Sequence, residues 1–156
     1  MQLDTLIVKN FQCFGPDGIA LDMTDPVTTM IGANGSGKTA VFQALNRLFG
    51  LGGSARKIER SDFHLPVDAD DVENECELHL EAVFSFPELD EDTPGAAVAE
   101  FWTQMSASEP DDPLKARIVL KAVWVDDGTP DGVVESSIRW ITRTDDDYEW
   151  DSCKPL

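Results

Sequence analysis

The feature that most constrains this chain is the run GANGSGKT at positions 32 to 39. It matches the pattern GxxxxGK[ST], and it lies between an apolar segment and a segment with helical periodicity. Glycines let such a loop curl so that successive backbone N–H groups point inward, and a helix N-terminus adds the positive end of its dipole. The pattern therefore predicts a loop that binds the phosphates of a nucleotide, ATP in the first place and GTP as the alternative.

Two side chains of this loop carry the expected chemistry. The Lys38 ammonium group can reach the β- and γ-phosphates, and the Thr39 hydroxyl is placed to ligate a Mg²⁺ ion shared with them. The alternative is a glycine-rich turn with an incidental lysine, and the flanking strand and helix patterns disfavour it. The other predicted binding residues contribute N–H groups or turns, and they are Gly32, Asn34, Gly35, Ser36 and Gly37.

Apolar periodicity predicts the strands. Extended segments at 3–10 and 19–23 flank the turn residues 14–18 and should pair antiparallel. A short strand at 27–31 is expected to run directly into the glycine loop. Strict alternation over 76–86 predicts a strand whose even-numbered residues face the core. Two further runs, 116–125 and 133–142, flank a turn-rich stretch and predict an antiparallel hairpin.

Two helices are expected. The first begins near Gly37 and ends at the glycines after Phe49. The second, near 94–106, has Thr93 as its N-cap and Pro94 at its first position. The end of the chain after Asp145 is expected to be weakly ordered. The apolar faces of the two helices comprise Val41, Phe42, Ala44, Leu45, Leu48 and Phe49, and Val98, Phe101, Trp102 and Met105. The fold class is α/β, with a mixed sheet that includes antiparallel strands packed on the P-loop helix, in a single domain over 1–156.

The charge of the chain is unusual, because 30 acidic residues against 12 basic ones give a net charge of −18. Residues 1 to 60 hold six Lys or Arg and five Asp or Glu, so the acidic excess lies beyond them. This balance opposes nonspecific binding of nucleic acid by the chain alone. It is typical of a solvated acidic face or an acidic proteome, and the alternative is repulsion that keeps DNA away from this lobe.

No signal peptide and no transmembrane run is present in the sequence, which predicts a cytoplasmic protein without membrane contact. The three cysteines Cys13, Cys76 and Cys153 are widely spaced and odd in number, so they are expected to be reduced rather than to form a disulfide framework or a zinc site.

Three other groups of residues are weaker candidates. His64 and His79 are expected on different elements, which favours separate histidines over a metal pair. The basic cluster of Arg56, Lys57 and Arg60 favours a solvated loop over a contact with DNA or a partner. An acidic linker favours solvation over cation binding, and its residues are Asp68, Asp70, Asp71, Glu73 and Glu75.

The opening segment 6–11, Phe14 and the GANGSGKT loop resemble the N-terminal lobe of ABC-type ATPases of the SMC, RecF and OLD families. Further residues are most similar to the OLD (overcoming lysogenisation defect) nucleases, including Gabija-type defence proteins, and they are Ser61, Asp62, Phe63, Trp124, Asp126, Asp127, Gly128 and Trp140. Gln12 stands where many of these relatives have arginine.

This resemblance implies an ATPase in which two protomers sandwich ATP between one P-loop and the partner's signature motif. It also implies, for OLD proteins, a C-terminal Toprim domain that cuts DNA in repair or phage defence. The expected partners are therefore the remainder of the ATPase, with its Walker B and signature motifs, or a second protomer. DNA is expected as a partner of the full assembly only.

A Walker B motif needs an apolar strand that ends in Asp-Glu, because the Asp holds Mg²⁺ and the Glu polarises the attacking water. The nearest imitation is 122–127, which ends in Asp126 and Asp127, but it runs into Gly-Thr-Pro-Asp-Gly and favours a hairpin turn. No catalytic residue, LSGG-like signature or Toprim carboxylate cluster is identified. The chain is therefore expected to be the first lobe of a larger ATPase, as a fragment or as one part of a split protein.

Two other functions compete with this interpretation. One is a stand-alone nucleotide-binding subunit with a regulatory or assembly role and no turnover. The other is an ordinary P-loop kinase or GTPase, which is disfavoured because those folds place parallel strands after the first helix.

Overall fold

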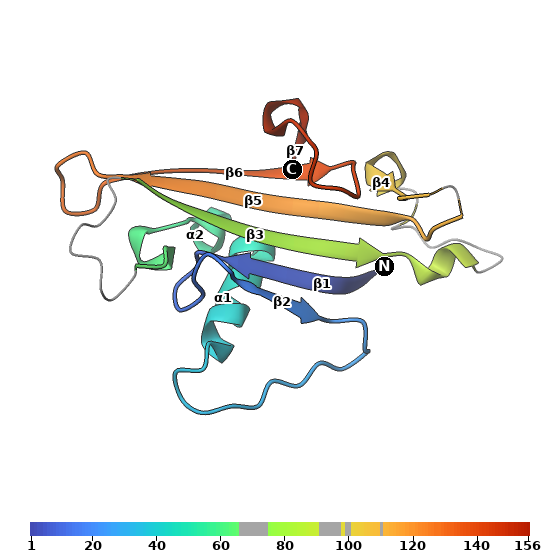
Figure 1. Cartoon of the computed structure of the whole chain (residues 1–156), viewed down its shortest axis with the longest axis horizontal. Coiled ribbons are helices and arrows are strands. Elements are labelled where there is room, and N and C mark those ends of the chain that lie inside the picture. The colour runs from blue at the N-terminus through green and yellow to red at the C-terminus, as the bar shows by residue number, and fades with distance from the viewer. Residues whose placement is uncertain (66–74, 91–97, 99–100, 110) are drawn as a thin grey trace.

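The chain builds one sheet, with strand order β2-β1-β3-β5-β6-β7 and β4 added beside β5, in a computed structural model (Figure 1). The structure describes residues 1–65, 75–90, 98, 101–109 and 111–156. The strands are β1 (Gln2–Lys9), β2 (Ile19–Asp22), β3 (Glu75–Ser85), β4 (Met105–Ser106), β5 (Lys115–Val125), β6 (Val133–Ile141) and β7 (Lys154–Pro155). The α-helices are α1 (Lys38–Phe49) and α2 (Gly53–Arg56), and 3₁₀ helices span Arg60–Asp62, Pro87–Asp90, Trp102–Gln104 and Trp150–Ser152.

The core lies between α1 and one face of the sheet. Ala44 and Leu48 of α1 belong to the same buried cluster as Leu6 of β1 and Leu80 of β3. Because side chains alternate along a strand, the even-numbered residues of β3 point into this cluster, as predicted. Among the described residues, none of the helices combines the length and apolar composition that a membrane span requires.

The two antiparallel pairings expected from the sequence, that of the first two strands and that of the hairpin, are confirmed. β1 pairs with β2, and β3 pairs with the hairpin strand β5 along its whole length, with Leu80 opposite Leu120. The hairpin of β5 and β6 closes at Val125 and Val133, on either side of the turn-rich stretch. α1 begins directly after Gly37, also as predicted.

The predicted strand at 27–31 is wrong. This segment has no regular structure and runs as a long loop from β2 to α1, away from the sheet (Figure 1). Val27 is 79% exposed and Ile31 is 92% exposed. A strand requires a neighbour for its backbone groups, and the described part of the chain places none beside this segment. As a result every strand pair among the described residues is antiparallel, so the prediction of a mixed sheet is also wrong here.

The predicted helix near 94–106 is wrong at its C-terminal end. Val98 and Phe101 are helical, but Met105 and Ser106 form β4, because the start of β5 offers them an edge for pairing. Trp102 is exposed rather than buried on an apolar helix face, and so is Phe42 of α1. The expected cap at Thr93 and Pro94 lies outside the described residues.

The end of the chain is better ordered than its composition predicts. Residues 142–156 cross the face of the sheet that is opposite α1, and β7 pairs with β6 at its edge (Figure 1). The Leu156 N–H donates to the carbonyl of Ile138 at 3.1 Å. The final segment therefore covers part of the second face of the sheet.

Candidate nucleotide-binding site

The first turn of α1 presents unpaired donors. The first backbone N–H groups of any helix lack acceptors within the helix, and in the described structure no side chain caps the N-terminus of α1. No acidic residue lies in this turn, and a helix of this length adds a positive dipole end there. The turn can therefore bind an anion.

Lys38 folds back across the loop that precedes α1. Its Nζ atom donates to the carbonyl oxygen of Gly32 at 2.8 Å, to that of Ala33 at 2.7 Å and to Ser36 Oγ at 3.3 Å. These acceptors are neutral oxygens, so a phosphate oxygen placed nearby would be a stronger partner for the ammonium group. The lysine is thus held over the loop where an anion would sit.

Gly37 is required by both its backbone and its surroundings. Its φ angle of 89° is left-handed, a conformation that favours glycine. A Cβ atom there would lie 2.6 Å from Phe14 Cζ and 3.1 Å from Cys13 Sγ. The turn after β1 therefore packs directly on the glycine that starts the helix.

A pocket of about 450 Å³ opens at this loop. Of the predicted site residues, Gly32 and Ser36 do not line it but accept hydrogen bonds from Lys38, and the others line it. Its full lining is Gln12, Cys13, Asn34, Gly35, Gly37, Lys38, Thr39 and Ala40. Gln12 and Cys13 were not predicted to belong to the site. For Gln12 the signal in the sequence is the arginine that many of the similar ATPases have at this position, whereas for Cys13 it is only a place in the turn after the first strand, because the approach of Cys13 to Gly37 depends on tertiary packing.

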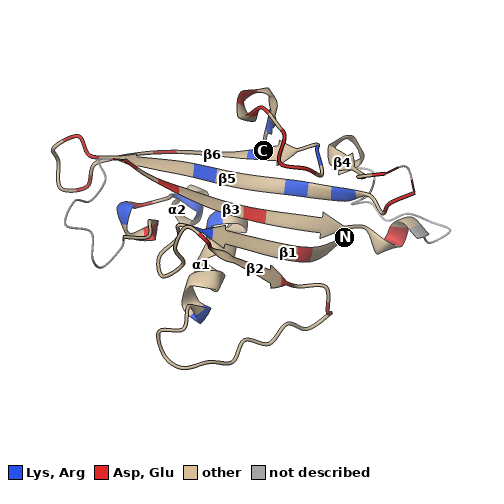
Figure 2. Ribbon diagram, viewed as in Figure 1, with Lys and Arg blue, Asp and Glu red and all other residues tan. Residues whose placement is uncertain are grey.

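The charge around this pocket differs from that of the rest of the chain. Between Pro26 and Ile58 the sequence contains no Asp or Glu. Figure 2 shows the loop that leads to α1, and α1 itself, without acidic residues beyond the beginning of that loop. In a protein with a net charge of −18, this segment adds no negative charge that would repel an anion.

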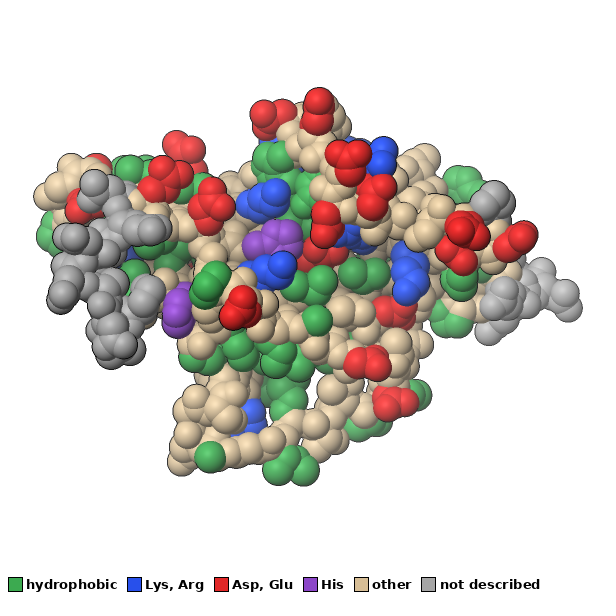
Figure 3. Space-filling view, in the orientation of Figure 1, with side chains coloured by type: hydrophobic (Ala, Val, Ile, Leu, Met, Phe, Trp, Pro, Cys, Tyr) green, Lys and Arg blue, Asp and Glu red, His purple; other side chains and the backbone are tan. Residues whose placement is uncertain are grey.

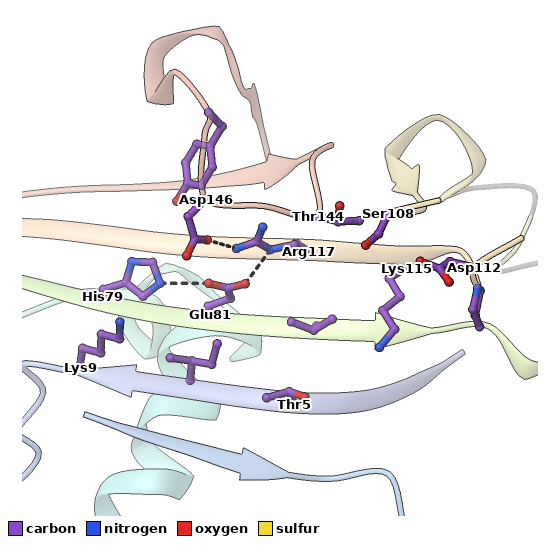
Figure 4. A pocket seen from close by; sticks show the side chains of 14 residues that line it. Thr5, Lys9, His79, Glu81, Ser108, Asp112, Lys115, Arg117, Thr144 and Asp146 are labelled. Atoms are coloured by element: carbon purple, nitrogen blue, oxygen red, sulfur yellow. Dashed lines mark hydrogen bonds and ion pairs between the residues drawn. The ribbon is translucent and has the colours of Figure 1, made fainter. Parts of the chain in front are cut away.

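A larger hollow of about 710 Å³ lies on the opposite face of the sheet, where it is lined by residues of β1, β3, β5 and the final segment (Figure 4). Its centre is Glu81, whose Oε1 accepts from Arg117 Nε at 2.7 Å and whose Oε2 pairs with His79 Nε2 at 3.2 Å. Burial alone would raise the pKa of Glu81, but the bonds from His79 and Arg117 outweigh it and lower that pKa.

This second hollow has mixed charge and is internally neutralised. Arg117 also donates to Asp146 at 2.8 Å and to the carbonyl oxygens of Arg143 and Asp145. Figure 3 shows histidine and Lys or Arg side chains at the centre of this face, with acidic side chains around them. The network fastens the final segment to the sheet, so it explains a structural contact better than a ligand site.

The remaining candidates are dispersed. Asp126 and Asp127 are exposed in the β5–β6 turn and accept backbone N–H groups there, which confirms the hairpin interpretation. His64 donates to the Gln12 carbonyl, whereas His79 pairs with Glu81 two residues further along β3.

Two residues of the predicted basic cluster contact different partners. Lys57 Nζ lies 3.5 Å from Glu59 Oε1, and Arg60 Cζ lies 4.6 Å from the centroid of the Trp124 ring. Most of the acidic linker, from Asp68 to Glu73, lies outside the described residues. Within the described residues no three His, Cys, Asp or Glu side chains are grouped to hold a metal ion.

The chain matches a known protein family. A family model described as an AAA ATPase domain matches residues 1–97, which include β1, β2 and the whole Lys38 loop. The chain belongs to this ATPase family. No curated protein matches it.

The fold also has a counterpart among solved structures. One similar structure comes from work on ATP-driven dimerization and DNA-stimulated activation of SMC ATPases. The alignment covers 90% of this chain and 69% of the chain in that structure, with a TM-score of 0.50 and 19% sequence identity. At this identity the likeness concerns the fold. The family match agrees with the predicted ATPase, and the fold is similar to that of a solved SMC ATPase structure.

Proposed function

We propose that this chain is the ATP-binding lobe of a larger OLD-like, ABC-type ATPase, in which Lys38 and the first turn of α1 hold the β- and γ-phosphates. The observation that carries this proposal is the position of the Lys38 ammonium group over the loop carbonyls of Gly32 and Ala33, beside a helix N-terminus without a side-chain cap. Backbone N–H groups from Asn34 to Thr39 would supply the remaining contacts.

A Mg²⁺ ion fits the same place. Thr39 is exposed in the first turn of α1 and lines the pocket, so its hydroxyl is available as a ligand. In P-loop enzymes this hydroxyl and the phosphate oxygens share the ion, and the ion neutralises the charge that develops on the phosphates.

Hydrolysis has a second requirement, a positioned carboxylate that activates water. In the described structure, no Asp or Glu lines the pocket. We propose that the missing groups come from the remainder of the ATPase or from a second protomer, and that DNA is a substrate of the full assembly. A stand-alone subunit that binds nucleotide without turnover is the second candidate, and this same lining favours it.

An exposed apolar surface supports the need for a further lobe. Val27 and Ile31 on the loop before α1 are 79% and 92% exposed, Phe42 on α1 is 62% exposed, and Leu51 after α1 is fully exposed. The segment 27–31 has the β-branched composition of a strand, and P-loops normally follow a strand. We propose that the rest of the ATPase pairs with this segment and buries it as a strand.

Thermal unfolding with added nucleotide tests the proposal. A ligand that binds only the native state at a hundred times its Kd stabilises that state by about 2.7 kcal/mol. Mg-ATP should therefore raise the melting temperature, by more than Mg-GTP does, and removal of Mg²⁺ with a chelator should reduce the shift. A melting temperature that no nucleotide changes would contradict the proposed function.

A further inference from the structure

The turn that follows β1 holds an unusual backbone conformation beside the P-loop. Asn10 has a φ angle of 51° and Gln12 one of 50°, and these are the non-glycine residues with positive φ in the described chain. Such conformations persist only when the surrounding structure enforces them, and they cluster at functional sites.

The segment 61–64 supplies the restraint. The Gln12 N–H donates to the carbonyl oxygen of Asp62 at 2.8 Å, and the His64 N–H donates to that of Asn10 at 3.0 Å. The His64 side chain adds a third bond, from Nδ1–H to the Gln12 carbonyl oxygen at 2.7 Å. Phe11 and Phe63 form a β-bridge between the two segments. Both left-handed residues are therefore bonded to this one segment.

Asp62 ties the same segment to the helix that bears the P-loop. Its buried carboxylate accepts from Arg47 Nε at 2.9 Å and from a second guanidinium nitrogen at 3.2 Å. It also accepts the Glu59 N–H at 2.9 Å, which fixes its own position. Because Arg47 lies in the last turn of α1, this pair sets the place of the β1 turn relative to the whole helix.

The turn after β1 also forms one wall of the nucleotide pocket. Gln12 and Cys13 line that pocket, and Phe14 and Cys13 pack on Gly37 at the start of α1. The Gln12 side-chain amide also donates to Gln43 Oε1 of α1. A shift of the turn would therefore move a wall of the pocket and loosen the packing around Gly37.

We infer that the segment 61–64 is a positioning element for nucleotide binding, with His64 and Asp62 as its positioning residues. The inference rests on the proposed function, because it assigns to this segment the task of holding the pocket wall that the nucleotide meets. It gives a role to the Ser-Asp-Phe residues, which the P-loop chemistry alone leaves unexplained.

Isothermal titration of Mg-ATP into three variants tests it. His64→Ala removes the bond to Gln12, and loss of one ordinary hydrogen bond should raise the Kd about fivefold. His64→Asn places an amide N–H near the position of Nδ1 and should restore the Kd to within about twofold of the wild type. His79→Ala, which changes the other histidine on the far face of the sheet, is the matched control and should leave the Kd unchanged.

Equal Kd values for His64→Ala and the wild type would overturn the inference while leaving the proposed function intact. A loss in His64→Ala that His64→Asn does not reverse would also count against it. If the wild type itself fails to bind Mg-ATP, the proposed function fails and this inference fails with it.

Amide hydrogen exchange of the wild type gives a second readout that does not depend on the folding of any variant. If the segment positions the pocket wall, Mg-ATP should slow exchange at the Gln12 and His64 amides, which bond the two segments together. Exchange at both amides that is unchanged by saturating nucleotide would show that the contact is structural only, and would overturn the inference.

Discussion

Glu81 and Arg117 form an ion pair within the face of the sheet opposite α1, with 2.7 Å between Oε1 and Nε and with side chains only 4% and 8% exposed. Removing one partner of such a buried pair leaves a charge without compensation, which costs about 3 to 5 kcal/mol. Because Asp146 still pairs with Arg117, Glu81→Gln should lower the free energy of unfolding by less than this, as measured by urea denaturation at pH 7. Asp145→Asn, which removes an exposed carboxylate paired with Arg143, is the control and should change little.

The same pair should make stability depend on pH in the acid range. The bonds from His79 and Arg117 hold the folded-state pKa of Glu81 below its ordinary value of 4.5. A carboxyl with a lowered folded pKa contributes stability that is fully present above the unfolded pKa and is lost as pH falls through the folded one. Below about pH 4.5, we expect the urea denaturation midpoint to decrease more steeply with falling pH in the wild type than in Glu81→Gln. Parallel profiles would contradict this assignment.

The exposed loop before α1 and the core should respond very differently to truncation. Leu80 is completely buried between the sheet and α1, so Leu80→Ala should destabilise the fold by about 2 to 5 kcal/mol. Ile31 is almost fully exposed, and Ile31→Ala should change the stability of this chain by less than about 0.5 kcal/mol. Urea unfolding curves of the two variants check this contrast. A large loss in Ile31→Ala would mean that the loop packs on the domain.

Local patterns were sufficient to predict much of this fold. The alternation around Leu78 and Leu80 predicted β3 and its buried face, and the Asp-Gly-rich turn predicted the β5–β6 hairpin. The glycines of the P-loop predicted the start of α1 at Lys38. In each case the pattern and the structure depend on the same few neighbouring residues.

The errors arise where distant contacts decide the structure. The segment 27–31 has strand composition but no neighbour to pair with in the described chain, and Met105 becomes a strand because β5 offers an edge. Glu81 follows the polar alternation of β3, yet it is buried because Arg117 and the final segment cover it. Gln12 joins the pocket through a turn held by Asp62, which the sequence pattern does not encode.

The purified chain should bind Mg-ATP but hydrolyse it very slowly. Lys38 and Thr39 can hold phosphate and metal, whereas the described lining of the pocket offers no carboxylate to activate water. Phosphate release at high protein concentration should therefore equal that of Lys38→Ala, which controls for contaminating ATPase. Steady turnover well above the control would mean that a water-activating residue acts within this chain. Asp126 and Asp127 would then be the first residues to substitute.

Calorimetric titration of Mg-ATP into the Lys38→Ala variant tests whether the Lys38 loop binds ATP. Hydrogen bonds from a charged donor are worth about 1.5 to 3 kcal/mol, so this change should weaken Mg-ATP binding by about 10- to 150-fold. Lys57→Ala is the matched control, because that side chain is 70% exposed and pairs with Glu59 away from the pocket. A strong loss of affinity is expected in Lys38→Ala alone, and equal affinity in the two variants would mean that the Lys38 loop does not hold the phosphates.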